Sequence, residues 1–287
     1  MEYIMKIENL CKRYKAFSLK NISFSLPKGY IMGFVGQNGS GKTTTIRSIL
    51  GIANKDSGNI EVFGLDNLKD YREVKQRISV VFDSLCYPPH LKIKEVEAML
   101  KSFYDKWDTE EFHRLIKKFK LHEKEKIGKF SKGMRMKLMV AVALSHKAEL
   151  IILDEPTSGL DPVARDELLD ILSEYISDEN NSILFSTHIT ADLERIADYV
   201  TVLNDGEVWY TGTKDELMEK FVVIKGDADD LPDEIFKKTI GFHNYRNGFE
   251  AMLDAENAKE LPEEIEYEKA NMDDILIYVA KESAKNE

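Results

Sequence analysis

Short apolar runs alternate along the chain with longer segments in which apolar residues recur at the helical period. The apolar runs predict strands near 4–7, 19–26, 30–35, 60–63, 78–82, 150–153, 182–186, 199–203 and 208–210. The segments between them predict helices near 44–50, 134–146, 162–176 and 189–198. This alternating order indicates an α/β fold with a largely parallel, helix-covered sheet.

Residues from about 93 to 129 interrupt this alternation with a charged, helical pattern. Two groups of apolar residues are each expected to share one helix face: Val96, Met99, Leu100 and Phe103, followed by Phe112, Leu115, Ile116 and Phe119. We interpret this stretch as a helical subdomain, covering about residues 84–146. It is inserted into an α/β domain of residues 1–220.

The chain changes character after about residue 220. A new strand begins at 222–224, prolines punctuate acidic turns, and a final helix is expected over 272–281. Residues 221–287 hold 8 Lys/Arg against 17 Asp/Glu, so they carry −9 of the net charge of −11. We expect a small acidic α+β domain that docks on the rest of the chain, dimerises or regulates it. Its charge argues against a surface for nucleic acid or anionic lipid and is typical of a solvated face.

Cysteine usage and hydropathy indicate the cellular compartment of the protein and whether the chain spans a membrane. Two cysteines are too few for a disulfide framework and suit a reducing cytosol. No signal peptide is evident, and the longest apolar run, 138–144, is far shorter than the about 20 residues that span a bilayer. The chain is therefore expected to be cytoplasmic and not to cross a membrane by itself.

Residues 36–43 read Gly-Gln-Asn-Gly-Ser-Gly-Lys-Thr and fit the pattern G-x-x-x-x-G-K-[ST]. We call them the phosphate loop, because this pattern is typical of loops that bind phosphate between a buried strand and a helix. Here the strand 30–35 precedes the loop and the helix 44–50 follows it. Their glycines allow backbone N–H groups to turn towards a phosphate, and the helix N-terminus adds partial positive charge. Lys42 is expected to reach the β- and γ-phosphates of a nucleoside triphosphate, and the Thr43 hydroxyl to bind Mg²⁺. A chance glycine-rich turn would leave the order of strand, loop and helix unexplained.

Two other strands end in residues with suitable chemistry. The strand 150–153 ends in Asp154, expected to hold Mg²⁺ through hard oxygen ligands, and Glu155, expected to act on the attacking water as general base. An acidic turn at a strand end is the alternative. His188 follows the apolar strand 183–185, at an edge where functional residues of open α/β sheets gather. A lone histidine is more often structural than catalytic.

Residues 130–135, Phe-Ser-Lys-Gly-Met-Arg, precede another helix, and we call them the signature segment. Ser131 is expected to cap that helix, and a serine with a glycine-exposed backbone at a helix start is a second anion-binding surface. This surface and the phosphate loop each head their own helix. One phosphate therefore cannot easily contact both within one chain, whereas a second chain resolves the difficulty.

These motifs together resemble the ATP-binding-cassette (ABC) ATPases over roughly residues 1–220. The family signature Leu-Ser-Gly-Gly-Gln corresponds to residues 130–134, at the expected distance before Asp154 and Glu155. Residues 158–161 match the family's loop that crosses between protomers, and His188 matches its switch histidine. Tyr14 falls where the family stacks an aromatic ring on adenine, although most tyrosines are simply half-buried.

The resemblance implies the fold of a P-loop NTPase cassette: a mixed sheet with flanking helices, an inserted helical subdomain and an N-terminal antiparallel β subdomain. It also implies a set of functional residues. Catalysis would rest on Lys42, Glu155 and His188, with His188 sensing the γ-phosphate. Mg²⁺ would be bound by Thr43, Asp83 and Asp154. ATP would be contacted by Tyr14, Gly36, Asn38, Gly39, Ser40, Gly41, Lys42, Thr43, Thr44 and, across a shared site, by Ser131, Gly133 and Asp161.

Two places depart from the family pattern. In the signature segment Lys132 replaces a glycine and Met134 a glutamine, but Ser131 and Gly133 remain, so phosphate contact from a second chain is still expected. Asp83 stands where the family usually has glutamine. A carboxylate binds Mg²⁺ but cannot donate a hydrogen bond as an amide does. Asp83 is therefore expected to bind metal more tightly or to couple differently to the partner.

The resemblance further implies an exporter-type ATPase subunit, for an antimicrobial peptide or a small molecule. It would be peripheral on the inner face of the membrane, through a separately encoded transmembrane permease. Two ATPase chains, in a homodimer or a heterodimer with a sister ATPase, would bury ATP head to tail and reopen on hydrolysis.

Other ATPases with a phosphate loop compete with this interpretation. The main alternative is a soluble ABC ATPase that acts on ribosomes or nucleic acid. Such proteins commonly have two cassettes, coiled-coil insertions or basic surfaces, which this sequence does not show, so nucleic acid is not an expected partner. A kinase or GTPase would leave the signature segment and residues 158–161 unexplained.

Overall fold

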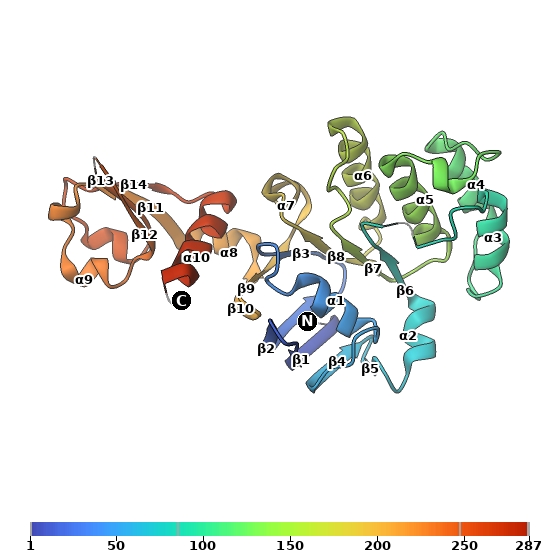
Figure 1. The fold of residues 1–287 in the computed structure, drawn as a ribbon, viewed down its shortest axis with the longest axis horizontal. Helices are drawn as coiled ribbons and strands as arrows, with labels where there is room; N and C mark the ends of the chain where they lie inside the picture. The colour runs from blue at the N-terminus through green and yellow to red at the C-terminus, as the bar shows by residue number, and fades with distance from the viewer. Residues whose placement is uncertain (1, 85, 247, 286–287) are drawn as a thin grey trace.

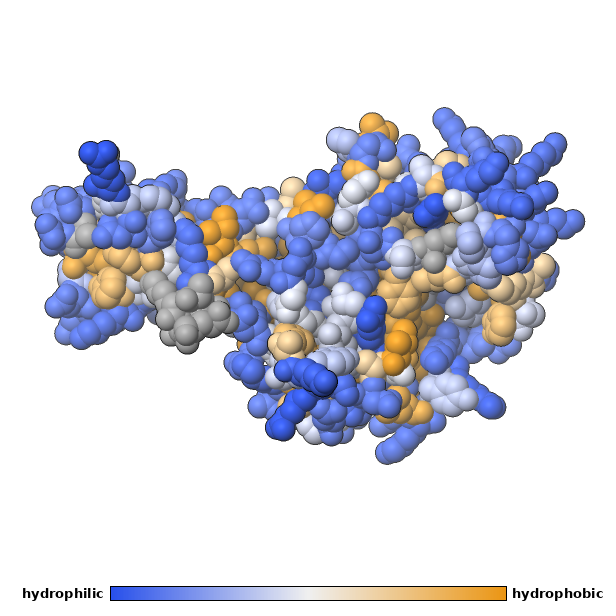
Figure 2. All heavy atoms as spheres, viewed as in Figure 1, coloured by the Kyte–Doolittle hydropathy of each residue, from blue (hydrophilic) through white to orange (hydrophobic). Residues whose placement is uncertain are grey.

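The computed structural model describes residues 2–84, 86–246 and 248–285. Three sheets and their helices build the molecule, with the C-terminal sheet at one end of its long axis and a helical layer at the other (Figure 1). Polar residues cover most of the face in Figure 2, and apolar residues gather between the helical layer and the N-terminal strands. Among the helices of the described residues, none combines the length and the apolarity needed to cross a membrane.

The N-terminal sheet is antiparallel, with strand order β2-β1-β4-β5. Its strands are β1 (Tyr3–Arg13), β2 (Ser18–Pro27), β4 (Ser57–Val62) and β5 (Leu65–Asp66). The alternating apolar residues of β1 and β2 face the central sheet and form one core with it. This is the N-terminal antiparallel β subdomain that the resemblance implied.

The central sheet has strand order β10-β9-β3-β8-β7-β6, and all its pairs are parallel except that of the edge strand β10 with β9. Its strands are β3 (Ile31–Val35), β6 (Ile78–Val81), β7 (Leu150–Asp154), β8 (Ser182–Thr187), β9 (Tyr199–Asn204) and β10 (Glu207–Thr213). Every residue of β3, β7 and β8 is buried. Burial on both faces explains why these strands are continuous apolar runs.

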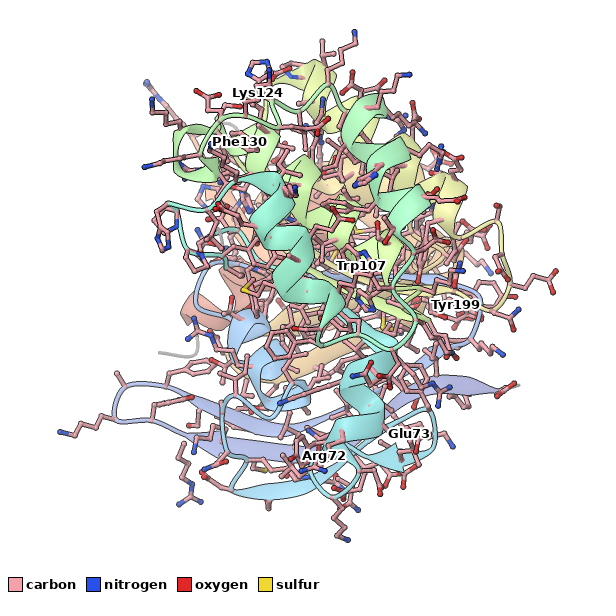
Figure 3. The ribbon with its side chains drawn as sticks, turned by 90° about the vertical axis from the view of Figure 1, so that its right-hand side faces the viewer. Arg72, Glu73, Trp107, Lys124, Phe130 and Tyr199 are labelled. Atoms are coloured by element: carbon pink, nitrogen blue, oxygen red, sulfur yellow. The ribbon has the colours of Figure 1, made fainter. Side chains whose placement is uncertain are left out.

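Helices connect and cover these strands. They are α1 (Lys42–Ile49), α2 (Tyr71–Arg77), α3 (Ile93–Lys101), α4 (Thr109–Lys118), η1 (Ile127–Lys129), α5 (Lys132–Ser145), α6 (Pro162–Tyr175), α7 (Thr190–Ile196) and α8 (Lys214–Lys220). Helices α3, α4 and α5 form the helical layer. Figure 3 looks onto it and shows Trp107 among these helices; its ring lies 5.2 Å from that of Phe112.

The second predicted apolar face in the helical layer is buried throughout, from Phe112 to Phe119. In the first group, Val96 and Leu100 are buried, but the prediction for Phe103 is wrong because α3 ends at Lys101 and Phe103 lies in the turn that follows. Its side chain is 64% exposed. It borders a groove of about 490 Å³, lined mainly by apolar residues of α1, α2, β6 and the helical layer.

His146 follows α5 and is fully buried, with its ring stacked on Tyr104 at a centroid distance of 3.9 Å. Burial lowers the pKa of His146 to about 4. In the unfolded chain histidine titrates near pH 6.5. Between that pH and about pH 4, His146 is therefore protonated in the unfolded chain and neutral in the folded one.

Acidification is thus expected to destabilise the protein through His146. The free energy of unfolding should fall by about 2 kcal/mol between pH 7 and pH 5 from this group alone. The variant His146→Phe keeps a stacked ring but cannot titrate. Urea denaturation at the two pH values should show a smaller loss for the variant; equal losses would contradict the assignment.

The C-terminal residues form an antiparallel sheet with strand order β12-β13-β11-β14. Its elements are β11 (Phe221–Gly226), η2 (Ala228–Asp230), α9 (Asp233–Phe236), β12 (Ile240–Tyr245), β13 (Gly248–Asp254), η3 (Asn257–Glu260), β14 (Glu266–Lys269) and α10 (Met272–Lys285). The predicted final helix is α10, which begins at Met272 and extends beyond Lys281. One sheet face has an apolar cluster of its own around Ile224 and Phe249.

Helix α10 joins this sheet to the rest of the molecule. Its residues Met272, Ile275 and Tyr278 belong to the large core that also contains β8 and α7 residues. In addition, Thr190 Oγ1 at the start of α7 donates to Asp273 Oδ1 at 2.7 Å. The C-terminal sheet is therefore packed against the central sheet's helices and not merely tethered to them.

Candidate functional site

The carboxyl ends of four adjacent parallel strands bring the predicted site residues to one edge of the central sheet. Val35 pairs with Thr187, and Asp154 with Ser186, so β3, β7 and β8 end side by side. Strand β6 ends next to β7, two residues before Asp83. Loops at this edge of an open parallel sheet form its usual ligand-binding crevice.

The phosphate loop requires glycine where the chain turns into α1. Gly41 has φ of 111°, in the region that favours glycine, and a Cβ there would lie 2.5 Å from Leu19 Cδ2. A Cβ on Gly36 would lie 2.3 Å from the carbonyl oxygen of Leu203. Helix α1 begins at the next residue after Gly41, so its free N–H groups face the loop.

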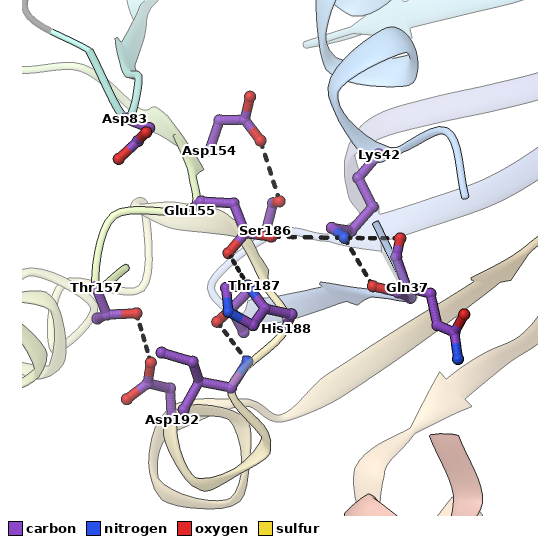
Figure 4. A network of polar contacts seen from close by, with 12 residues as sticks. Gln37, Lys42, Asp83, Asp154, Glu155, Thr157, Ser186, Thr187, His188 and Asp192 are labelled. Carbon is purple, nitrogen blue, oxygen red and sulfur yellow. Dashed lines mark hydrogen bonds and ion pairs between the residues drawn. The ribbon is translucent and has the colours of Figure 1, made fainter. Parts of the chain in front are cut away.

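Lys42 is buried within this loop, and its ammonium group lies against oxygen atoms. Its Nζ donates to the carbonyl oxygens of Gly36 at 2.7 Å and Gln37 at 3.2 Å. It also lies 3.5 Å from Glu155 Oε1 (Figure 4). The carbonyl groups of the phosphate loop thus hold the ammonium group of Lys42 at the start of α1.

Thr43 and Asp154, two of the three predicted metal ligands, are in direct contact. Thr43 Oγ1 donates to Asp154 Oδ2 at 3.1 Å, and Ser186 Oγ donates to Asp154 Oδ1 at 3.2 Å. Burial raises the pKa of Asp154, while these two hydroxyl groups lower it. A hydroxyl and a buried carboxylate at hydrogen-bond distance are a hard-oxygen pair that fits Mg²⁺. The third predicted ligand, Asp83, instead forms an ion pair with Lys132.

Glu155 lies between Lys42 and His188. Its Oε2 is 2.6 Å from His188 Nδ1, while its Oε1 faces Lys42. The backbone of Glu155 has φ of 54°, which is uncommon for a residue other than glycine, and its N–H donates to the carbonyl of Ser186 at 3.1 Å. The strained turn after β7 therefore aims this carboxylate at the phosphate loop.

A cavity of about 440 Å³ opens over the phosphate loop. It is lined by Ala16, Phe17, Gln37, Asn38, Gly39, Gly41, Lys42, Thr43, Thr44 and Glu155. Tyr14 is half-exposed and does not line it, whereas the ring of Phe17 does and also packs near Gly41. Ser40 is buried in the loop and does not reach the cavity. Phe17 was missed because only the spacing of Tyr14 matched a family position.

The other predicted contact residues lie at two helix starts. Ser131 Oγ accepts from the backbone N–H of Met134 at 3.2 Å, which confirms the predicted cap of α5. Asp161 caps α6 by accepting from two backbone N–H groups at 3.0 Å. Together with Gly133, these residues are absent from the cavity lining at the phosphate loop. The signature segment therefore does not contribute to the cavity over the phosphate loop of its own chain.

Asp192 on α7 is a buried carboxylate that sequence reasoning missed. Its two oxygens accept from Thr157 Oγ1 at 2.6 Å and from Arg165 Nε at 2.5 Å. It thereby ties the turn after Glu155 to α7, which begins two residues after His188. An acidic residue on an otherwise apolar helix face was the only sign of it in the sequence.

Comparison with known proteins agrees on one family. The family model described as "ABC transporter" matches residues 19–158. The bacitracin transport ATP-binding protein BcrA of Bacillus licheniformis is 35% identical over 213 residues, covering 72% of this chain and 69% of that protein. The ABC-type transporter ATP-binding protein EcsA of Bacillus subtilis is 36% identical over 231 residues, covering 78% of this chain and 92% of that protein.

A solved structure gives the same result at the level of the fold. The structure of an ATP binding subunit of an ABC transporter matches with a TM-score of 0.68 and 29% identity. The match covers 75% of this chain and 91% of that chain.

Proposed function

The chain belongs to the ABC transporter family as an ATP-binding subunit with ATPase activity, and on that basis we propose that it powers export through a separate transmembrane permease. The exported compound would be an antimicrobial peptide or a small molecule, and the bacitracin transport protein among its relatives supports this class. The observation that carries the mechanism is the row Lys42–Glu155–His188 at the phosphate loop.

Mg²⁺ fits the site through Thr43 and Asp154, whose oxygens already lie 3.1 Å apart. When bound, it neutralises charge on the phosphate oxygens of ATP. Phosphoryl transfer needs mainly positioning and charge stabilisation, which the chain's own groups supply. In the proposal, α1 and the loop N–H groups bind the phosphates, and Lys42 exchanges its carbonyl partners for phosphate oxygens.

Glu155 acts on the attacking water in this proposal. His188, 2.6 Å away, holds the carboxylate in place, and the turn of positive φ keeps it directed at the phosphate loop. A carboxylate so placed accepts the proton of water as it attacks the γ-phosphate. Phe17 lines the cavity, and the backbone N–H of its neighbour Tyr14 donates to the Phe17 carbonyl oxygen at 2.7 Å. We assign stacking on the base of ATP to one of these two rings.

Closure of two chains over ATP completes the site. Ser131, Gly133 and Asp161 do not line the cavity of their own chain, and we assign their phosphate contacts to the nucleotide of a second chain. ATP then touches both chains only when they are closed, so binding shifts that equilibrium and hydrolysis reverses it. The second chain is a copy or a sister ATPase.

The apolar groove beside α1 and β6 is the proposed contact for the permease. Ile52 is 63% exposed and Phe103 is 64% exposed at its border, and exposed apolar side chains that gather at one place are typical of a contact surface. The groove lies between the α/β domain, residues 1–220, and the helical subdomain within it. Residues 221–287 form a small domain in this proposal, and its docking through α10 favours a stabilising role.

Affinity purification of the full chain from detergent-solubilised membranes tests this function. A multi-span membrane protein should co-purify, and Phe103→Glu should reduce its recovery at least tenfold, because contact with the permease would remove a carboxylate from water at a mainly apolar surface. Tyr267→Glu, at a 60% exposed position on β14, is the matched control and should have no effect. Recovery of ribosomes without a membrane protein would contradict the proposal and favour the soluble alternative.

A further inference from the structure

The two departures from the family pattern contact each other. Asp83, just beyond the end of β6, forms an ion pair with Lys132, the first residue of α5. A strand end at the predicted metal site is thereby joined to the signature segment of the same chain. The family usually has glutamine at the position of Asp83 and glycine at the position of Lys132, and these two residues carry no charges to form an ion pair.

Lys132 also lies against a third segment of the site. A Cβ built on Gly159 would be 3.5 Å from both Cδ and Nζ of Lys132. Gly159 belongs to residues 158–161, which lead into the capped start of α6. One ammonium group therefore stands where the end of β6, the start of α5 and the loop before α6 converge.

This ion pair is accessible to water and easily exchanged. The side chain of Lys132 is 38% exposed and that of Asp83 is 55% exposed, in contrast to the 6% of Lys42. Exposed pairs of this kind contribute little net stability, because water and salt screen them. A more highly charged group brought to the same place would take the lysine from its carboxylate.

We propose that Lys132 exchanges Asp83 of its own chain for the terminal phosphate of ATP held by a second copy. The inference rests on the two-chain site proposed above. Lys132 follows Ser131 directly, so it moves towards that phosphate with the signature segment. ATP carries several negative charges against one on Asp83, so the phosphate is the stronger partner. Asp83 thus competes with ATP for Lys132 and raises the ATP concentration at which two copies close.

Dimerisation driven by ATP measures this competition directly. The parent is Glu155→Gln, which prevents hydrolysis from reopening the dimer, and light scattering after size exclusion reports the dimer at increasing ATP·Mg²⁺. Asp83→Asn should lower the half-maximal ATP concentration by up to about fivefold, because the competitor is removed. Lys132→Gln should raise it by roughly tenfold or more, because a charge-assisted phosphate contact is lost.

Two further variants separate this exchange from a merely structural pair. The double variant should behave like Lys132→Gln alone, because Asp83 acts only through Lys132, and Lys132→Arg should restore most of the parent's response. Lys137→Gln is the matched control: Lys137 is on the same helix and pairs with Glu167 of α6, and its loss should leave the ATP dependence unchanged.

The directions in which Asp83→Asn and Lys132→Gln shift the half-maximal ATP concentration decide whether the proposed exchange is correct. If Asp83→Asn and Lys132→Gln both raise the required ATP concentration, the pair is structural or Asp83 binds the metal, and the exchange is wrong. If the parent dimerises but neither variant shifts it, only the exchange fails. If the parent stays monomeric at saturating ATP, the two-chain site itself fails and the exchange with it.

Discussion

Glu155→Gln is expected to slow ATP hydrolysis by about 10²- to 10⁴-fold while leaving ATP binding intact. An amide has nearly the shape of the carboxylate and can still lie between Lys42 and His188, but it cannot accept the proton of the attacking water. Steady-state phosphate release measures the first effect, and equilibrium binding of ATP measures the second. The variant should also accumulate as a dimer with ATP.

Glu194→Gln is the matched control for this experiment. Glu194 lies on α7, six residues beyond His188, and its side chain is exposed. Its replacement should leave hydrolysis unchanged. If Glu155→Gln retained wild-type turnover, Glu155 would be a turn residue and the general base would have to be sought elsewhere at this edge of the sheet.

Lys42→Ala is expected to weaken ATP binding by roughly 10- to 100-fold and to abolish measurable hydrolysis. Among the described residues, Lys42 is the only Lys or Arg that lines the phosphate-loop cavity. The carbonyl groups of the loop hold its ammonium group there. Removing it leaves the phosphates to the backbone N–H groups and the start of α1. Isothermal titration with ATP gives the affinity.

A loss of folding must be distinguished from a loss of binding in this variant, because Lys42 is 6% exposed. Lys42→Met keeps most of the side chain's volume, and its unfolding midpoint should remain near that of the wild type. Lys69→Ala, at a side chain that is 84% exposed, should change neither property. Wild-type ATP affinity in Lys42→Met would contradict the role assigned to the lysine.

Much of the fold followed from the pattern of apolar residues. Strands buried on both faces, such as β7 and β8, are continuous apolar runs, so their positions and the parallel sheet were predictable. Phe103 was placed wrongly because helical periodicity says nothing about where a helix ends. The C-terminal sheet was predicted only in outline, since its edge strand β14 is wholly exposed and carries no apolar alternation.

The site was predictable to the extent that its residues follow strands. Lys42 and His188 follow buried strands, Asp154 is the last residue of one, and parallel strands end at a common edge. Phe17 and Asp192 were not predictable in the same way. Phe17 reaches the cavity from a loop between strands of another sheet, and Asp192 is recognised only by its contacts with Thr157 and Arg165.

The sequence by itself determined the motifs of this protein: a loop with the phosphate-binding pattern, carboxylates at a strand end, and a signature segment that resembles that of the family. These are local properties, because glycine conformations, strand ends and helix starts depend on neighbouring residues. Only the tertiary structure joined Asp83 to Lys132, 49 positions apart, and α10 to the start of α7. Such contacts depend on how separate elements pack, which no local pattern records.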